Sequence, residues 1–406
     1  MSESPRFRLR AGDLAPFAIL ALMVLALALL PVFTEHTVRT ANVYNVFQNF
    51  SSYGLVALAL GITIIVGEFD LSVSSIYLLG GMVAVLTGAG SPLLGILAAL
   101  GAAVLVGLVQ GGLIAGFRLN SMPVTLGGYL VVLGITHLLG NSQSVLYENF
   151  DVGLRLDEPI AQVFSIRSLV SLGIFAVAAV VLRYLRVGRD IRAIGGDRRA
   201  ARVAGVRVDR LLVCVFVVSA LGAALPGALL SYSLATASPT NIGFDVLTFS
   251  ATAALIGGVR LTGGKGGAFG IAAGVLSLSV LQEILAILRS PEYVSSLITG
   301  GLLVVVTIVW APELLQWFRT TRVSTAAARP CPTSGRSGST RIHSSPICSR
   351  RASAWETSSS SRARRLSTSG GRSSATATST HRPSRRSATS RACSRPAGPA
   401  STGSSR

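Results

Sequence analysis

Charged residues are scarce in this sequence. Only 13% of its 406 residues are charged, whereas 50% are hydrophobic and the mean hydropathy is +0.60. This balance excludes an ordinary soluble globular protein. Cysteine is rare as well. The sequence has four cysteines, far apart and without a CxxC pair, so they indicate neither a disulfide framework nor a zinc site. They are Cys214, Cys331, Cys348 and Cys393.

Motifs that would supply energy or catalysis are also missing. The nearest approach to the phosphate-binding loop GxxxxGK[ST] is the string around Lys265, which has Val259 in place of the first glycine and lacks the Ser or Thr that holds magnesium. The sequence contains no HExxH helix and no nucleophile elbow. We therefore predict a protein that is neither an ATPase nor a hydrolase, with no catalytic residues, no metal ligands and no cofactor.

Long apolar runs are abundant. A helix of about 20 apolar residues crosses the roughly 30 Å of hydrocarbon in a bilayer. Ten such runs lie near residues 14–33, 51–67, 71–89, 92–115, 123–141, 167–185, 211–231, 246–259, 268–288 and 295–312. The second and eighth are short enough to be broken or re-entrant helices. We predict an all-α polytopic membrane protein of about ten transmembrane helices, with a transmembrane domain over residues 14–322.

The distribution of arginine predicts how this domain is oriented, because basic loops stay in the cytoplasm. Residues 1–13 contain Arg6, Arg8 and Arg10 and are predicted to be cytoplasmic. With ten crossings, loop 186–210 is also cytoplasmic, and it is the most basic loop of the domain. Loop 142–166 is mainly acidic, and we predict that it faces outward together with residues 232–245.

The composition changes near Val323. Residues 323–406 contain 15 arginines and one acidic residue, Glu356, without apolar periodicity, so we predict a disordered basic tail. The sequence has 35 arginines but a single lysine, Lys265, which suggests a GC-rich gene; such a gene read out of frame tends to give Arg/Ser/Pro strings. A frameshift product is the favoured interpretation, and a genuine tail lying on anionic headgroups is the alternative. Aromatic residues are nearly absent from the tail, which argues against nucleic-acid binding.

Few strongly polar side chains fall within the apolar runs. Burying a charge in hydrocarbon costs several kcal/mol, so such residues often mark a pathway. Asp70 lies with Glu68 between the second and third runs, and the simpler interpretation of both is that they face water, with Asp70 capping the next helix. Gln282 and Glu283 lie in the ninth run. We retain Asp70, Gln282 and Glu283 as pathway candidates.

A short capped helix is predicted inside the basic loop. Asp197 can accept the first free amides as the N-cap, and Gly205 can take the left-handed position after the last turn. A two-turn helix without a core is marginal alone, so it should dock on the membrane domain or on a partner. A docked helix between two spans is the element that a transporter needs if its energy comes from another chain.

The same loop carries a resemblance to a known family. It resembles the cytoplasmic loop of the ribose-type sugar permeases of ATP-binding cassette importers, within the branched-chain amino acid/ribose permease superfamily. The similarity covers residues 40–312, although Glu68 stands where the family usually has Gly. The matching motifs are Gly188-Arg189, Ala193-Ile194-Gly195-Gly196, Ala200-Ala201-Arg202 through Gly205, Ala237-Ser238-Pro239, Gly243-Phe244-Asp245 and Leu261-Thr262-Gly263-Gly264-Lys265-Gly266.

The resemblance implies a permease subunit in a homo- or heterodimer in a bacterial plasma (inner) membrane. It also implies ATPase subunits inside, a solute-binding protein outside and a monosaccharide as substrate. Motion of the ATPases would reach the membrane through Gly195, Gly196, Asp197, Ala200, Ala201, Arg202 and Gly205. Three alternatives stay open: a permease for branched-chain amino acids or nucleosides, an ion-driven secondary transporter using Glu283 with Asp70 or Glu68, and a membrane anchor without transport.

Overall fold

A computed structural model describes residues 11–33, 39–239 and 242–310 of the chain. All of them belong to the first of the two units into which the chain divides, Met1–Ala328. The three N-terminal arginines and the tail from Val323 lie outside the described residues. The predictions made for those two segments therefore stay predictions.

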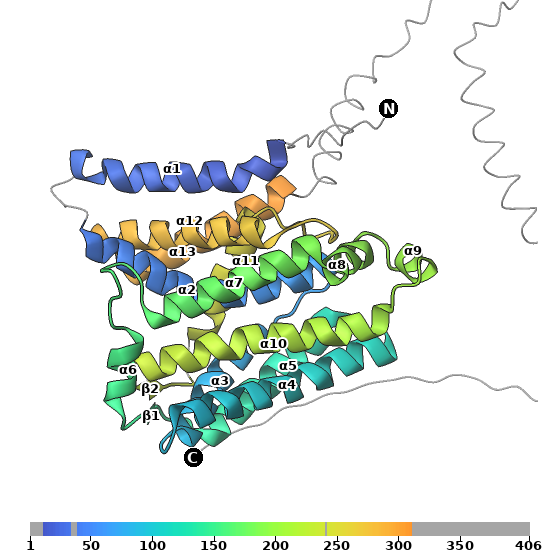
Figure 1. The fold of residues 1–406 in the computed structure, drawn as a ribbon, viewed down its shortest axis with the longest axis horizontal. Coiled ribbons are helices and arrows are strands. Elements are labelled where there is room, and N and C mark those ends of the chain that lie inside the picture. Colours follow the sequence, from blue (N-terminus) through green and yellow to red (C-terminus); the bar gives the residue numbers. More distant parts are fainter. Residues whose placement is uncertain (1–10, 34–38, 240–241, 311–406) are drawn as a thin grey trace, which may run out of the picture. The chain divides into compact units, whose positions relative to one another are not determined.

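Each of the ten apolar runs corresponds to a helix in the described part of the chain (Figure 1). They are α1 (Ala11–Phe33), α2 (Thr40–Val66), α3 (Val73–Thr87), α4 (Pro92–Phe117), α5 (Ser121–Leu139), α7 (Ile166–Tyr184), α10 (Val208–Ser233), α11 (Ile242–Ile256), α12 (Ala268–Ile287) and α13 (Glu292–Trp310). Seven are long and apolar enough to cross a membrane, while α3, α11 and α13 offer shorter apolar stretches. The polytopic helical fold is confirmed.

The second run was predicted wrongly as a short helix that might be broken. Helix α2 is continuous over 27 residues and begins eleven residues before the apolar run. Its first turns contain three polar residues, Asn42, Asn45 and Gln48, so they were not recognised as part of an apolar helix. Their side chains form hydrogen bonds with residues of other helices. Polar residues directed at protein do not shorten a membrane helix, because only lipid-facing positions need to be apolar.

Smaller elements connect the long helices. They are α6 (Phe150–Leu156), α8 (Arg186–Gly196), α9 (Arg198–Val203), and the strands β1 (Val145–Leu146) and β2 (Thr236–Ala237). The strands pair antiparallel, with Val145 opposite Ala237, and thereby join two loops that are far apart in sequence. This strand pair, α6 and α8 were not predicted from the sequence.

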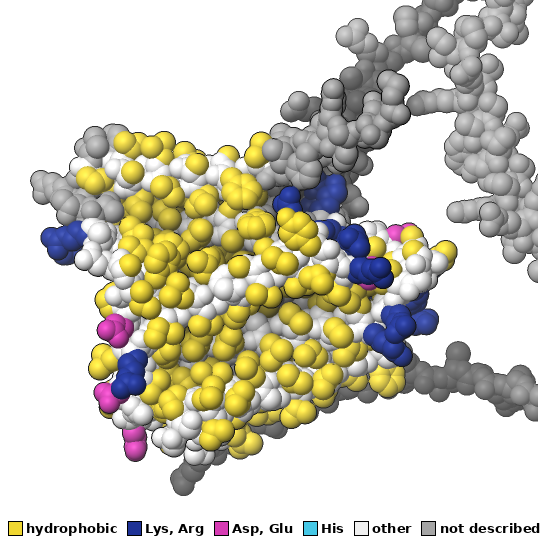
Figure 2. All heavy atoms as spheres, viewed as in Figure 1, with side chains coloured by type: hydrophobic (Ala, Val, Ile, Leu, Met, Phe, Trp, Pro, Cys, Tyr) yellow, Lys and Arg dark blue, Asp and Glu magenta, His cyan; other side chains and the backbone are white. Residues whose placement is uncertain are grey.

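Charge separates the two ends of the helical bundle. Figure 1 shows α6, β1 and β2 at one end and α8 and α9 at the other. On the face drawn in Figure 2, basic side chains gather around α8 and α9, acidic ones gather mainly at the end that carries α6, and a broad hydrophobic band lies between them. This distribution supports the prediction that loop 186–210 faces the cytoplasm and loop 142–166 faces outward.

Helices α2, α3 and α10 form the centre of the bundle. Helix α10 packs against α4, α3 and α2, while α12 packs against α2 and α1. The close approach depends on small residues: a Cβ built on Gly80 would lie 2.5 Å from the carbonyl oxygen of Ala224, and one on Gly107 would lie 2.8 Å from Cα of Val217. Helices α4, α5 and α7 expose many large apolar side chains, as lipid contact requires.

A partly buried ion pair fastens the end of the bundle that carries α6. Nε of Arg167 on α7 donates to Oδ1 of Asp157 at 2.7 Å, and Arg167 is only 5% exposed. Asp157 also accepts a hydrogen bond from Ser233 on α10, and its backbone oxygen accepts one from the hydroxyl of Tyr44 on α2 at 2.6 Å. One loop residue thus joins three helices through its carboxylate and its backbone oxygen.

Candidate functional site

The predicted capped helix is present at the end of the bundle that carries α8 and α9. Asp197 has an extended backbone and its Oδ1 accepts hydrogen bonds from the amides of Arg199 at 2.7 Å and Ala200 at 3.1 Å. Gly205 ends the helix with φ +87°, in the left-handed region that favours glycine. The helix has the predicted bounds, because α9 spans Arg198–Val203 with Asp197 as N-cap and Ala204 as C-cap. The residues before Asp197 form the separate helix α8.

Gly195 fixes this segment to the membrane domain. A Cβ built on Gly195 would overlap the carbonyl oxygen of Ile65, in the last turn of α2, and would lie 2.5 Å from the amide nitrogen of Gly264. That amide donates to the Ile65 oxygen at 2.8 Å. Three segments therefore meet backbone to backbone: the end of α2, the end of α8 and the loop between α11 and α12. We call this contact the glycine junction (Ile65, Gly195, Gly264).

The predicted coupling residues divide into two groups. Ala201 is 3% exposed, and Gly195 is half-buried at the glycine junction. The others are exposed, and no atom lies within 4 Å of a Cβ built on Gly196: Gly196, Asp197, Ala200, Arg202 and Gly205. One group thus anchors the segment to the bundle, and the other is open to a partner chain.

An ion pair gives this segment a second attachment. Arg198 at the start of α9 contacts the carboxylate of Glu68, which follows α2 and is 8% exposed. The prediction that Glu68 faces water is wrong, because Arg198 covers it. Arg198 itself was missed by the sequence analysis. The one sequence signal for it was Glu68, which stands where the resembling family usually has glycine. An acidic side chain at such a position indicates a cation nearby.

Asp70 is also buried rather than facing water, with no exposed surface. Its Oδ1 accepts hydrogen bonds from the amide of Ser72 at 3.0 Å and from the Ser72 hydroxyl at 2.6 Å, and its Oδ2 accepts one from Ser219 on α10 at 2.8 Å. It thus binds the Ser72 amide at the start of α3, as predicted, and also joins α3 to α10. Three donors on one carboxylate compensate its burial.

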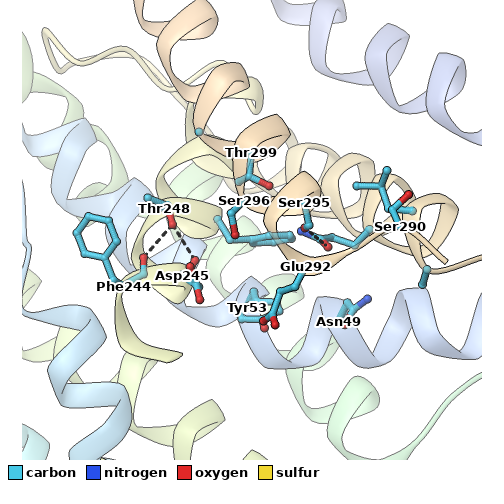
Figure 3. Close-up of a pocket in the computed structure, with 15 residues that line it drawn as sticks. Asn49, Tyr53, Phe244, Asp245, Thr248, Ser290, Glu292, Ser295, Ser296 and Thr299 are labelled. Carbon is cyan, nitrogen blue, oxygen red and sulfur yellow. Dashed lines mark hydrogen bonds between the residues drawn. The ribbon is translucent and has the colours of Figure 1, made fainter. Parts of the chain in front are cut away.

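A polar cavity of about 540 Å³ lies near the opposite end, among α2, α11, α12 and α13. Figure 3 shows Tyr53, Asp245 and Glu292, from three different helices, around this space. Gln282 of α12 lines the cavity, and its Oε1 accepts a hydrogen bond from the Ser295 hydroxyl at 2.7 Å.

Glu283 does not line that cavity. It is 4% exposed, and its Oε1 accepts hydrogen bonds from the side-chain amides of Asn42 at 2.8 Å and Asn45 at 3.2 Å, both on α2. The three pathway candidates therefore have separate surroundings: Gln282 faces the cavity, Glu283 joins α12 to α2, and Asp70 joins α3 to α10. The structure does not combine them into one path.

The cavity lining has a definite chemistry. It offers the amide of Asn49, the hydroxyls of Thr248 and Thr299, and the carboxylates of Asp245 and Glu292. Aromatic rings contribute as well, since Tyr53 and Phe249 lie with their ring centroids 4.7 Å apart. Among the described lining residues there is no lysine, arginine or histidine. The cavity is therefore suited to a neutral or cationic polar solute.

Comparisons with known proteins identify the family. Residues 42–307 match the family described as "Branched-chain amino acid transport system / permease component". The chain belongs to this family. The resemblance found in the sequence is thereby confirmed, and the permease is a membrane-spanning subunit of an ATP-binding cassette importer, a transport component. No solved structure matches it.

Several curated relatives resemble the permease over most of their length. It is 34% identical to the L-arabinose ABC transporter permease protein of Azospirillum brasilense, over 63% of this chain and 75% of the relative. It is 29% identical to the D-allose transport system permease protein of Escherichia coli (strain K12), over 62% and 77%. It is also 29% identical to the fructose import permease protein of Rhizobium meliloti, over 66% and 75%.

Proposed function

We propose that the permease moves a monosaccharide across the plasma membrane into the cytoplasm. The observation that carries this proposal is the polar, cation-free lining of the outer cavity, together with relatives named for the transport of L-arabinose, D-allose and fructose. A neutral sugar presents hydroxyls that hydrogen-bond to amides and carboxylates, and apolar ring faces that pack on aromatic rings.

The same lining disfavours an amino acid as substrate. A free amino acid carries a carboxylate, which needs a cation or several convergent donors when it leaves water. The described lining residues of the cavity include two carboxylates, Asp245 and Glu292, and no basic side chain. A substrate carboxylate would be repelled there, whereas sugar hydroxyls would donate to both groups.

ATPase subunits would dock at the inner end and drive transport through the segment 186–210. The exposed part of this segment, including Asp197 and Arg202, is available to a partner, and the glycine junction would pass its displacement to α2 and to the α11–α12 loop. We further propose that two permease subunits pair around a central path, that a binding protein delivers the sugar from outside, and that the N-terminus is cytoplasmic. Residues 14–322 would carry transport, and the tail would not.

An ion-driven mechanism has weaker support. A proton- or sodium-coupled carrier needs a carboxylate that can release its partners during each cycle. Asp70 and Glu283 each accept hydrogen bonds from two residues and cross-link helices, which is the arrangement expected of structural groups.

Uptake by proteoliposomes tests the proposal. Permease reconstituted with its ATPase and binding protein should accumulate a labelled monosaccharide only with ATP, and should ignore leucine. Gln282→Ala should lower sugar uptake roughly tenfold, the effect of losing about one good hydrogen bond in a closed site. Gln143→Ala, an exposed change in the outer loop, is the matched control. Uptake of leucine but of no sugar would contradict the proposal, as would sugar uptake driven by an ion gradient without the ATPase.

A further inference from the structure

A second cavity, at the inner end, has the opposite charge. It measures about 610 Å³ and lies where the start of α1, the ends of α7 and α11, helix α8 and the start of α12 come together. Four basic side chains from three different segments line it: Arg183 of α7, Arg192 of α8, and Arg260 and Lys265 of the α11–α12 loop. We call it the basic pocket.

The charged side chains among the described lining residues of the pocket are all basic, with no aspartate or glutamate. Of the ion pairs found among the described residues, none includes Arg192 or Lys265. Like charges gathered around one cavity repel each other, and an anion in the cavity relieves that repulsion. The convergence of Arg192 and Lys265 on one cavity therefore indicates an anionic ligand.

The backbone adds to the positive potential. Helix α12 begins directly after Gly267, which has no side chain to cap the first amides of the helix. Residues Gly266 to Gly270 line the pocket, so the first turn of a 20-residue helix opens into it. The first amides of a helix carry partial positive charge and bind phosphate oxygens well. No atom lies within 4 Å of a Cβ built on Gly267, which leaves space for such a group.

One side of the pocket is apolar and exposed. Phe17 of α1 is 46% exposed and Phe269 of α12 is 58% exposed, and both line the cavity. Helix α1 has only 11% of its apolar window buried, so most of it is available to lipid. Cations next to lipid-facing aromatic residues, at the inner ends of membrane helices, match the chemistry of a phospholipid at the headgroup level.

We infer that the basic pocket binds the phosphodiester headgroup of an anionic phospholipid from the inner leaflet. Arg192 and Lys265 contact the phosphate, the first turn of α12 donates amides to it, and Phe17 and Phe269 pack against the start of the acyl chains. An acidic surface of a partner protein would satisfy the cations as well, but it would leave the two phenylalanines without a role. The apolar rim favours the lipid.

The test uses the purified full chain in a neutral detergent, with phosphatidylglycerol, phosphatidylcholine of the same acyl chains, or inorganic phosphate added. Native mass spectrometry counts retained lipid, and thermal unfolding reports stabilisation. We expect phosphatidylglycerol alone to be retained and to raise the unfolding temperature. Arg192→Gln with Lys265→Gln should weaken its binding roughly tenfold or more. Arg207→Gln with Arg210→Gln removes the same charge from exposed positions outside the pocket and should leave binding unchanged.

Each other outcome overturns the inference. Equal retention of phosphatidylcholine would remove the need for charge, and an equal effect of inorganic phosphate would make the ligand a free anion. Equal losses in both double variants would indicate a diffuse basic surface. If phosphatidylglycerol does not bind, and the Arg192/Lys265 variant fails to retain ATPase subunits when the assembled importer is purified, the pocket is a protein-docking site. Sugar uptake is not measured in this test, so it stands apart from the transport proposal.

Discussion

Gly195→Ala should disrupt the connection between the cytoplasmic segment and the membrane helices. The new methyl group would overlap the Ile65 carbonyl oxygen and would lie 2.5 Å from the Gly264 amide nitrogen and 3.0 Å from the Ile65 carbonyl carbon. All three atoms are backbone, so no side chain can rotate away. The α8 segment, the end of α2 or the loop has to move, and the bond between Gly264 and Ile65 lengthens or breaks.

The expected cost follows from these contacts. Forcing extra volume into a packed site costs about 1–3 kcal/mol, and losing one backbone hydrogen bond adds about 1 kcal/mol. The higher helix propensity of alanine offsets up to about 1 kcal/mol of this. Gly196→Ala is the matched control, because it makes the same change one residue later, where no atom lies within 4 Å of the new Cβ. The propensity gain is common to both variants, so they should differ by about 2–4 kcal/mol in the free energy of unfolding.

Two measurements check this prediction. Unfolding of each purified variant should show Gly195→Ala melting several degrees below the wild type, with Gly196→Ala at or slightly above it. In proteoliposomes with the ATPase, Gly195→Ala should hydrolyse ATP with much less sugar uptake per ATP, while Gly196→Ala keeps the wild-type ratio. If both variants are equally stable and equally coupled, the glycine junction is neither tight nor part of the transmission.

Two further predictions concern the outer end. Arg167→Gln should lower the free energy of unfolding by about 1–3 kcal/mol, because it removes a charge-assisted hydrogen bond to the Asp157 carboxylate, whose side chain is 32% exposed and so keeps part of its hydration. Equal loss in Arg167→Gln and in the double variant with Asp157→Asn would contradict a specific pair. Asn149→Cys, in a background without native cysteines, should react with an impermeant thiol reagent on intact cells, whereas Arg207→Cys should react only in inverted vesicles; the reverse pattern would invert the topology.

The presence and place of the apolar helices follow directly from the sequence, because lipid demands apolar surface over a fixed length. The caps of α9 follow as well, since Asp197 and Gly205 act on their immediate neighbours. The length of helix α2 was underestimated, because hydropathy detects only the residues that suit lipid. The polar residues in its first turns face protein, so they gave no apolar signal.

The pairings within the site were beyond sequence reasoning. Asn42 and Glu283 are 241 residues apart, and Arg198 and Glu68 are 130 apart, so nothing local connects them. The sequence analysis placed Glu68 and Asp70 in water because both lie between two apolar runs. In the structure this connection is covered by α9, α10 and neighbouring side chains, which depends on tertiary packing alone.

The polar first turns of α2 have a consequence for the order in which the helices pack. Asn42 and Asn45 lie in the first two turns of this 27-residue helix, and their side chains lack their protein partner while α2 stands alone. The carboxylate that accepts their hydrogen bonds lies on α12, which is synthesised more than 200 residues later. The packing of α2 is therefore complete only after α12 has been made.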